Sequence, residues 1–390
     1  MKRFNRNVEV IYWVSFLSIL GYGAQRAVLS WHLKSLAIDA ATVGLFISFF
    51  GLPRAVMNVA GGFFTDRFSR RSNLVVGTLL YALLGYGLLA FLESGLGIAL
   101  SRALIGMGLA WATTAAMTVL SDYTDVSSRG TVFGIQKGFF WVGITFSGLI
   151  ATFLYNLIGF QAEMLIFAGI GLFSAYISFK FLDKKTPKET EVKKSLVLAK
   201  DWLTVVKLSM TDAKFLTLGL VGFLAKIIED GIVVVMLPLF FSDSALDAGL
   251  YITFFTLSFA FFQPFGGIMS DRVGRKNIIL TGNLISLLGL LFLWQGFMTF
   301  ASFLMGAGIG ILSPAAEAFS GDLAPEGLSG SVLGYWRFER DLGSFFGPLL
   351  LPPAALFFGK EIVLILVGLT IILSLVLSIQ NLPRKERLNV

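Results

Sequence analysis

The sequence predicts an all-α membrane protein with twelve transmembrane helices in two pseudo-symmetric six-helix bundles. Three observations lead to this fold class. Hydrophobic residues make up 56% of the 390 residues and charged residues only 14%, whereas a soluble domain carries roughly 25% charged residues. Apolar segments of about 20 residues, the length that crosses a bilayer, recur along the chain. The second half of the sequence also repeats patterns of the first.

The apolar segments predict six spans on each side of a polar linker. In the first half they lie at residues 8–33, 40–63, 74–92, 97–119, 131–155 and 162–182, and in the second half at 214–241, 248–269, 278–298, 299–319, 330–357 and 361–380. The predicted domains are therefore an N-terminal bundle, a cytoplasmic linker and a C-terminal bundle, at residues 1–182, 183–213 and 214–390.

The linker changes character along its length. Residues 183–194 are highly charged, whereas residues 195–210 place lysines every seven residues beside apolar positions. This second pattern predicts a basic amphipathic helix at the membrane surface. A simple tether between two bundles and a regulatory or lipid-sensing segment are both compatible with it.

Basic residues mark one side of the predicted protein. The N-terminus, the turns after the second and eighth helices, the linker and the C-terminal tail are rich in lysine and arginine. An even number of spans places all of them on one side, which the positive-inside rule makes cytoplasmic. We therefore expect a protein of the plasma membrane with both termini in the cytoplasm. The net charge of +7 follows from the same rule, so we expect no nucleic-acid partner.

Two basic turns in the sequence are copies of each other. Residues 62–71 read Gly-Phe-Phe-Thr-Asp-Arg-Phe-Ser-Arg-Arg, and residues 267–276 read Gly-Ile-Met-Ser-Asp-Arg-Val-Gly-Arg-Lys, 205 residues later. After the third helix of each half the offset is 200, so that Asp122 matches Asp322. The pattern G-x-x-x-D-R-x-x-R-[RK] in both halves resembles the signature loop of the major facilitator superfamily.

The resemblance implies two six-helix bundles that transport a solute by alternating access, related by an axis along the membrane normal. It is closest in motifs to proton-linked twelve-helix efflux members. It also implies that Asp66 caps a helix of the other half while Arg67 or Arg71 reaches Asp122, which locks an inner gate. A cluster of positive charge that only sets topology is the alternative. The expected gate residues are Gly62, Asp66, Arg67, Arg70, Arg71, Asp122, Gly267, Asp271, Arg272, Arg275, Lys276 and Asp322.

Ionisable residues at bilayer depth are costly and commonly functional. In this sequence they avoid the third, sixth, ninth and twelfth helices, which stand outside the cavity in this family, while the first, fourth, seventh and tenth line it. We expect substrate or coupling roles for Gln25, Arg26, Arg54, Arg102, Lys137, Lys226, Glu229, Asp230, Arg337, Glu339, Arg340 and Asp341. Salt bridges between the halves, without substrate contact, are the alternative.

The seventh helix carries the expected coupling site. Lys226 and Glu229 are three residues apart and can meet on one helix face. Asp230 points about 100° away on an α-helix, so it is less simply neutralised. Burial and like charge both disfavour the ionised form of two neighbouring carboxylates, and we expect one of them, preferably Asp230, to carry a proton.

Two further motifs bear on coupling. Arg102-x-x-x-Gly106-x-Gly108 resembles the fourth-helix motif of proton-linked members, although the glycines alone would serve helix packing. In the eleventh helix Arg337 and Asp341 can pair at i,i+4, beside a Gly343-x-x-x-Gly347-Pro348 run. That run resembles the antiporter motif, which is expected in the fifth helix. The fifth helix of this sequence lacks the proline of that motif, and in this respect the sequence departs from the antiporter pattern.

Composition excludes several functions. The chain has no cysteine and one histidine, His32, so thiol chemistry and a metal cluster are not expected. No phosphate-binding loop is present, so we expect no ATP use, no cofactor, and a proton gradient as the driving force. The expected partners are membrane lipids and a small-molecule substrate, with the chain as a monomer.

We therefore expect a secondary active transporter, not an enzyme, that exports amphipathic or anionic organic compounds. The alternatives are a proton-coupled uptake symporter of an organic anion, a lipid flippase on the same fold, and a membrane-embedded enzyme or scaffold.

Overall fold

The computed structural model describes residues 5–92, 94–124, 129–184, 199–325 and 329–383, and every regular element within these ranges is a helix. In this part of the chain nine stretches are long and apolar enough to cross a membrane. One of them, Val132–Phe181, turns at Gly159, whose φ of 78° breaks the helix, so it provides two spans. Two further helical stretches, at residues 6–35 and 213–240, complete the twelve spans. The predicted all-α membrane fold is confirmed.

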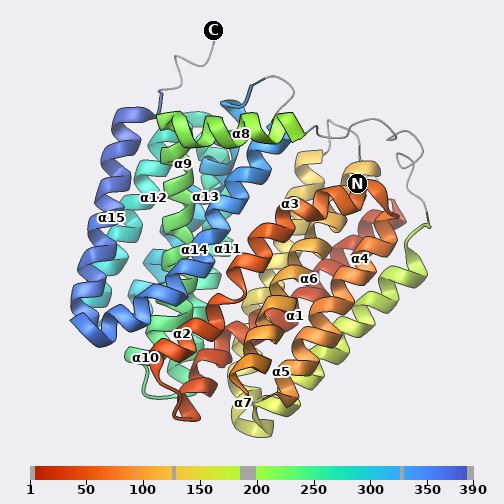
Figure 1. Cartoon of the computed structure of the whole chain (residues 1–390), viewed down its shortest axis with the longest axis horizontal. Helices are drawn as coiled ribbons and strands as arrows, with labels where there is room; N and C mark the ends of the chain where they lie inside the picture. Colours follow the sequence, from red (N-terminus) through yellow and green to blue (C-terminus); the bar gives the residue numbers. More distant parts are fainter. Residues whose placement is uncertain (1–4, 93, 125–128, 185–198, 326–328, 384–390) are drawn as a thin grey trace. The chain divides into compact units, whose positions relative to one another are not determined.

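The N-terminal half supplies six spans (Figure 1). The first is a single helix, the second is interrupted at Phe49 and Phe50, and the third contains a π-helical segment. The elements are α1 (Arg6–Ser35), α2 (Ala40–Ser48), α3 (Gly51–Arg67), α4 (Arg70–Leu79), η1 (Leu80–Tyr86), α5 (Gly87–Phe91), α6 (Gly95–Asp122) and α7 (Arg129–Phe181), the last of which holds the fifth and sixth spans.

The C-terminal half follows the same plan, with its own π-helical segment in the seventh span. Its elements are α9 (Ala213–Lys226), η2 (Ile227–Met236), α10 (Leu237–Phe240), α11 (Ala245–Val273), α12 (Arg275–Trp294), α13 (Met298–Asp322), α14 (Ser329–Phe358) and α15 (Lys360–Asn381). The expected division between the ninth and tenth spans at 298/299 was wrong by a few residues. The turn occupies residues 295–297, because Gly296 adopts a φ of 91° that glycine tolerates at low cost.

Contacts divide the chain into two compact units. The first comprises Met1–Leu33 and Phe49–Ser195, and the second comprises Lys34–Ser48 and Leu196–Val390. The segment Lys34–Ser48 thus groups with the second unit, although it precedes most of the first in sequence. Within the second unit α2 packs on α14, where Gly44 lies directly against the carbonyl of Pro348.

Glycines allow close helix contacts at equivalent places in both units. In the first unit, a Cβ on Gly108 of α6 would lie 2.7 Å from the carbonyl oxygen of Gly77. In the second, a Cβ on Gly308 of α13 would lie 2.6 Å from the carbonyl oxygen of Gly282. These pairs are related by the two offsets found in the sequence, 205 and 200, so the internal repeat also relates the helix packing.

The linker contains the expected helix, α8 (Ala199–Thr211). It lies across the ends of the second unit's helices (Figure 1) and buries Val205 against Phe215 and Val332. Leu203 and Met210 are 71% and 64% exposed. One apolar face is therefore packed, while other apolar side chains stay available to the membrane surface. Residues 185–198 lie outside the described ranges.

Candidate functional site

The first unit gathers arginines around one aromatic ring. Arg102 of α6 donates from Nη1 to Oε1 of Gln25 on α1 at 2.5 Å, and both side chains are at most 3% exposed. The guanidinium carbons of Arg102 and Arg54 lie 4.7 and 5.3 Å from the centroid of the Phe50 ring. Such cation–π contacts stabilise a buried guanidinium in part. The break between α2 and α3 places Phe50 at this point.

A third arginine joins the same group. Arg26 of α1, 3% exposed, donates from Nη1 to the hydroxyl of Tyr22 at 2.9 Å. The ring of Tyr22 stacks on Phe50 with centroids 5.4 Å apart. Four of the expected residues therefore come together: Gln25, Arg26, Arg54 and Arg102. We refer to these four residues, together with Tyr22 and Phe50, as the arginine cluster.

The arginine cluster concentrates positive charge in a buried place. The sequence has no aspartate or glutamate in residues 10–38, 40–65 or 94–121, which include the membrane-embedded parts of the first, second and fourth spans. Guanidinium groups match carboxylate, sulfonate and phosphate oxygens geometrically. The cluster is therefore suited to hold an anion. Lys137, also expected here, lies half-buried on α7.

The second unit gathers carboxylates around one lysine. Lys226 Nζ lies 2.6 Å from Glu229 Oε2 and 3.8 Å from Asp230 Oδ2. The Ser344 hydroxyl of α14 donates to Asp230 Oδ2 at 2.5 Å. All four residues are at most 8% exposed. The expected contact between Lys226 and Glu229 is confirmed.

The expected separation of Asp230 from that pair was wrong. The expectation considered only the angle between Glu229 and Asp230. Lys226 and Asp230 are four residues apart, and this spacing, like that of Lys226 and Glu229, brings side chains onto one helix face. Lys226 therefore reaches both carboxylates, at the start of the π-helical segment η2, and we call Lys226, Glu229, Asp230 and Ser344 the carboxylate cluster.

The remaining charges of α14 pair differently from expectation. Arg337 pairs with Glu317 of α13 at 2.5 Å, and Asp341, which is 0% exposed, pairs with Arg340 at 2.8 Å. The sequence had suggested Arg337 with Asp341, because only intrahelical spacing was considered. Glu339 lies beside α9, where a Cβ on Gly219 would be 2.6 Å from its Oε2.

The Gly343-x-x-x-Gly347 run packs α14 against the seventh span. Gly343 lies directly against the carbonyl of Phe223, and a Cβ on Gly347 would lie 3.1 Å from the Cα of Gly231. Both contacts are next to the carboxylate cluster. The run that resembled an antiporter motif therefore serves close contact between these two helices.

The two basic turns form equivalent ion pairs. Arg70 pairs with Asp122 at 3.3 Å, and Arg275 pairs with Asp322 as well as with Asp271. The next residue of each turn caps the last helix of its half. Arg71 donates to the carbonyl of Leu182, and Lys276 to that of Leu382, at 3.3 and 2.8 Å.

Arg70, the first residue of α4, contacts Asp122, which the sequence did not predict. Of the two expected partners, Arg71 donates instead to the carbonyl of Leu182, and the expectation for Arg67 is not tested. The surroundings of Gly62 and the side chains of Asp66 and Arg67 lie outside the described part of the structure. Arg272 is exposed, and a Cβ on Gly267 would lie 4.0 Å from the Cβ of Pro314.

Sequence reasoning missed Glu163. This residue of α7 is 0% exposed, and within the described part of the chain neither carboxylate oxygen has a hydrogen-bond partner. The sixth span was expected to begin at residue 162, which placed Glu163 at the end of that helix rather than inside it. The helix resumes directly after Gly159, which puts Glu163 one turn inside it. A turn signal at that glycine was the clue available in the sequence.

Known proteins resemble this chain over nearly its whole length. The sequence matches the model of the Major Facilitator Superfamily over residues 11–244 and 218–390. It is similar to the uncharacterized MFS-type transporter MJ1560 of Methanocaldococcus jannaschii, with 22% identity over 359 residues that cover 89% of this chain and 90% of the relative. It is also similar to the multidrug resistance protein MdtH of Aeromonas hydrophila subsp. hydrophila, with 26% identity over 406 residues and 96% of each chain covered.

A solved structure shares the fold. The crystal structure of a POT family transporter in complex with 5-aminolevulinic acid matches with a TM-score of 0.80, over 99% of this chain and 97% of that one. The two sequences are 15% identical, so this likeness concerns the fold alone.

Proposed function

The chain belongs to the major facilitator superfamily, and on this premise we propose that it is a proton-coupled exporter of amphipathic organic anions. In this proposal the arginine cluster binds the anionic group of the substrate, and the carboxylate cluster carries the proton. The protein is a multi-pass membrane transporter by family, whereas substrate, direction and coupling belong to the proposal.

The arginine cluster is the observation that carries the substrate class. Three guanidinium groups meet within contact distance of Phe50 and Tyr22. Aromatic rings beside cations suit a ligand with an apolar body and a charged end. A cationic substrate would meet repulsion at this place, because like charges in a low dielectric repel strongly.

The carboxylate cluster supports proton coupling. Two carboxylates share one ammonium group within 3.8 Å, so their full ionisation leaves one negative charge in excess. A single proton neutralises that excess, and the Ser344 hydroxyl remains a partner for Asp230 in either state. Binding and release of this proton would bias the seventh and eleventh spans, which touch at Gly231 and Gly347.

Export rather than uptake is favoured by one comparison. The relative that covers this chain at 96% carries the name of a multidrug resistance protein. The missing proline of the antiporter motif in the fifth helix argues against antiport. Uptake by symport is therefore the alternative that the experiment must distinguish from export.

The proposal is tested by ligand stabilisation followed by flux. Purified protein is heated with a panel of amphipathic anions, cations and neutral compounds, because a ligand that binds the folded state raises the unfolding temperature. We expect anions to stabilise the protein and Arg102→Gln to weaken their binding roughly 10- to 100-fold, the loss of one charged hydrogen bond. Lys214→Gln, which removes an exposed charge, is the matched control.

Flux then fixes direction. In inside-out vesicles energised by a proton gradient, export predicts accumulation of the stabilising anion, whereas symport predicts its depletion. Stabilisation by cations, or equal affinity of wild type and Arg102→Gln for every anion, contradicts the proposed substrate class.

A further inference from the structure

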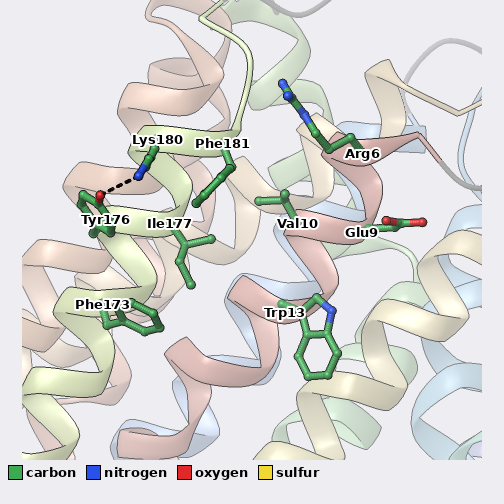
Figure 2. A pocket seen from close by; sticks show the side chains of 9 residues that line it. All are labelled: Arg6, Glu9, Val10, Trp13, Phe173, Tyr176, Ile177, Lys180 and Phe181. Atoms are coloured by element: carbon green, nitrogen blue, oxygen red, sulfur yellow. Dashed lines mark hydrogen bonds between the residues drawn. The ribbon is translucent and has the colours of Figure 1, made fainter.

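A groove opens between the beginning of α1 and the end of α7 in the first unit (Figure 2). It has a volume of about 500 Å³ and is lined by Arg6, Glu9, Val10, Trp13, Phe173, Tyr176, Ile177, Lys180 and Phe181. None of these residues belongs to the arginine cluster or the basic turns. The groove is therefore separate from the site already described.

The body of the groove is apolar and open to the surroundings. Trp13, Phe173 and Tyr176 are 57%, 55% and 51% exposed, and Phe173 and Tyr176 belong to a membrane-spanning stretch. An exposed aromatic surface on such a stretch faces lipid rather than water. This part of the groove is accordingly suited to a hydrocarbon chain.

One end of the groove is basic. Figure 2 shows Lys180 and Arg6 on opposite sides at the same end, with the rings of Trp13 and Phe173 toward the other end. Lys180 Nζ donates to the Tyr176 hydroxyl at 3.1 Å and lies 5.4 Å from the Phe181 ring centroid. These contacts hold the ammonium group at the rim, where tyrosine and tryptophan commonly meet lipid headgroups.

Arg6 adds a second charge at this rim. Its side chain is 68% exposed and pairs with Asp183 at 3.2 Å, and an exposed pair of this kind is weak. The Glu9 side chain points away from Val10 and Ile177 in Figure 2. The groove is thus lined by two basic residues and one acidic residue.

We propose that this groove binds an anionic phospholipid of the bilayer, with one acyl chain along Val10, Trp13, Phe173 and Ile177 and the phosphate between Arg6 and Lys180. The combination of an apolar channel with two cations at one end matches a lipid of this charge. A zwitterionic lipid offers the same chains but no net negative charge. The site thus distinguishes headgroups rather than tails.

The test measures lipid binding to the purified full chain by native mass spectrometry. Phosphatidylglycerol and phosphatidylcholine with identical acyl chains are titrated separately. We expect tighter binding of phosphatidylglycerol to the wild type and a roughly fivefold weaker binding to Lys180→Gln, the effect of one basic residue near a lipid surface. Lys180→Arg should retain the affinity, and Ile177→Trp should reduce the binding of both lipids by filling the groove.

Lys214→Gln is the control for the charge change, because Lys214 is an exposed lysine outside the groove. Thermal unfolding of each variant confirms that it is folded. Equal affinity for the two lipids, or equal effects of Lys180→Gln and Lys214→Gln, overturns the proposal. The groove would then be a surface that any bilayer lipid covers without selection for its headgroup. The outcome is independent of the transport activity, because no residue of the arginine or carboxylate cluster is altered.

Discussion

Gly106 of α6 lies directly against the backbone carbonyl of Phe50, at the break between α2 and α3. This contact brings Arg102, one turn earlier on α6, over the Phe50 ring. The second unit repeats the backbone contact between Gly306 and Phe255. The same packing therefore occurs in both repeats, but only the first adds an arginine one turn before the glycine.

The contact at Gly106 predicts a cost for any side chain there. In Gly106→Ala the new Cβ would overlap the Phe50 carbonyl, and a rigid backbone must shift to relieve it. We expect a loss of about 1–3 kcal/mol in the free energy of unfolding. Gly138→Ala, which meets nothing within 4 Å on α7, is the control and should gain up to about 1 kcal/mol of helix stability. Unfolding curves in detergent compare the two, and equal stabilities contradict the close packing.

The two equivalent ion pairs predict unequal effects of the same substitution. Arg70 and Asp122 are 3% and 6% exposed, whereas Arg275 and Asp322 are 21% and 39% exposed. Asp122→Asn removes a charged partner of a buried arginine, at a cost of up to about 3–5 kcal/mol. Asp322→Asn disturbs a more solvated pair and should cost at most about 1 kcal/mol. Thermal unfolding measures both, and a larger loss for Asp322→Asn would refute this reading of burial.

Asp183, which lies outside the membrane-spanning segments, should make the stability of the folded protein depend on pH. Hydrogen bonds from Tyr123 and Asn7, with the charge of Arg6, hold the pKa of its carboxyl below the usual 3.8. Because the folded-state pKa is lowered, this carboxylate contributes stability above pH 4, and the contribution is lost as the pH falls through the folded-state pKa. Asp183→Asn should lower the unfolding temperature by roughly 1–3 °C at pH 7, a small effect for a half-exposed group. The difference from wild type should shrink toward pH 3, and a constant difference contradicts the assignment.

Sequence periodicity was sufficient for the helices but not for their details. The span boundaries follow from apolar length, and the repeat offsets predicted which glycines correspond. The position of Asp230 was misjudged because its angle to Glu229 was considered and its i,i+4 spacing from Lys226 was not. Whether Arg70 or Arg71 reaches Asp122 depends on the starting residue of α4, which spacing alone does not fix. Phe50 was simply one apolar residue among many, and its role depends on a helix break visible only in three dimensions.

The carboxylate cluster provides the most direct test of the account, because proton coupling rests on it. Purified wild type, Asp230→Asn, Glu229→Gln and the double variant are placed in proteoliposomes with the anion identified by the stabilisation panel. Counterflow at equal concentrations needs only binding and reorientation, whereas uphill transport driven by a pH gradient also needs the proton. We predict that at least one single variant and the double variant lose pH-driven accumulation while retaining counterflow. If all three variants accumulate the anion at wild-type rates, the carboxylate cluster does not couple transport to protons.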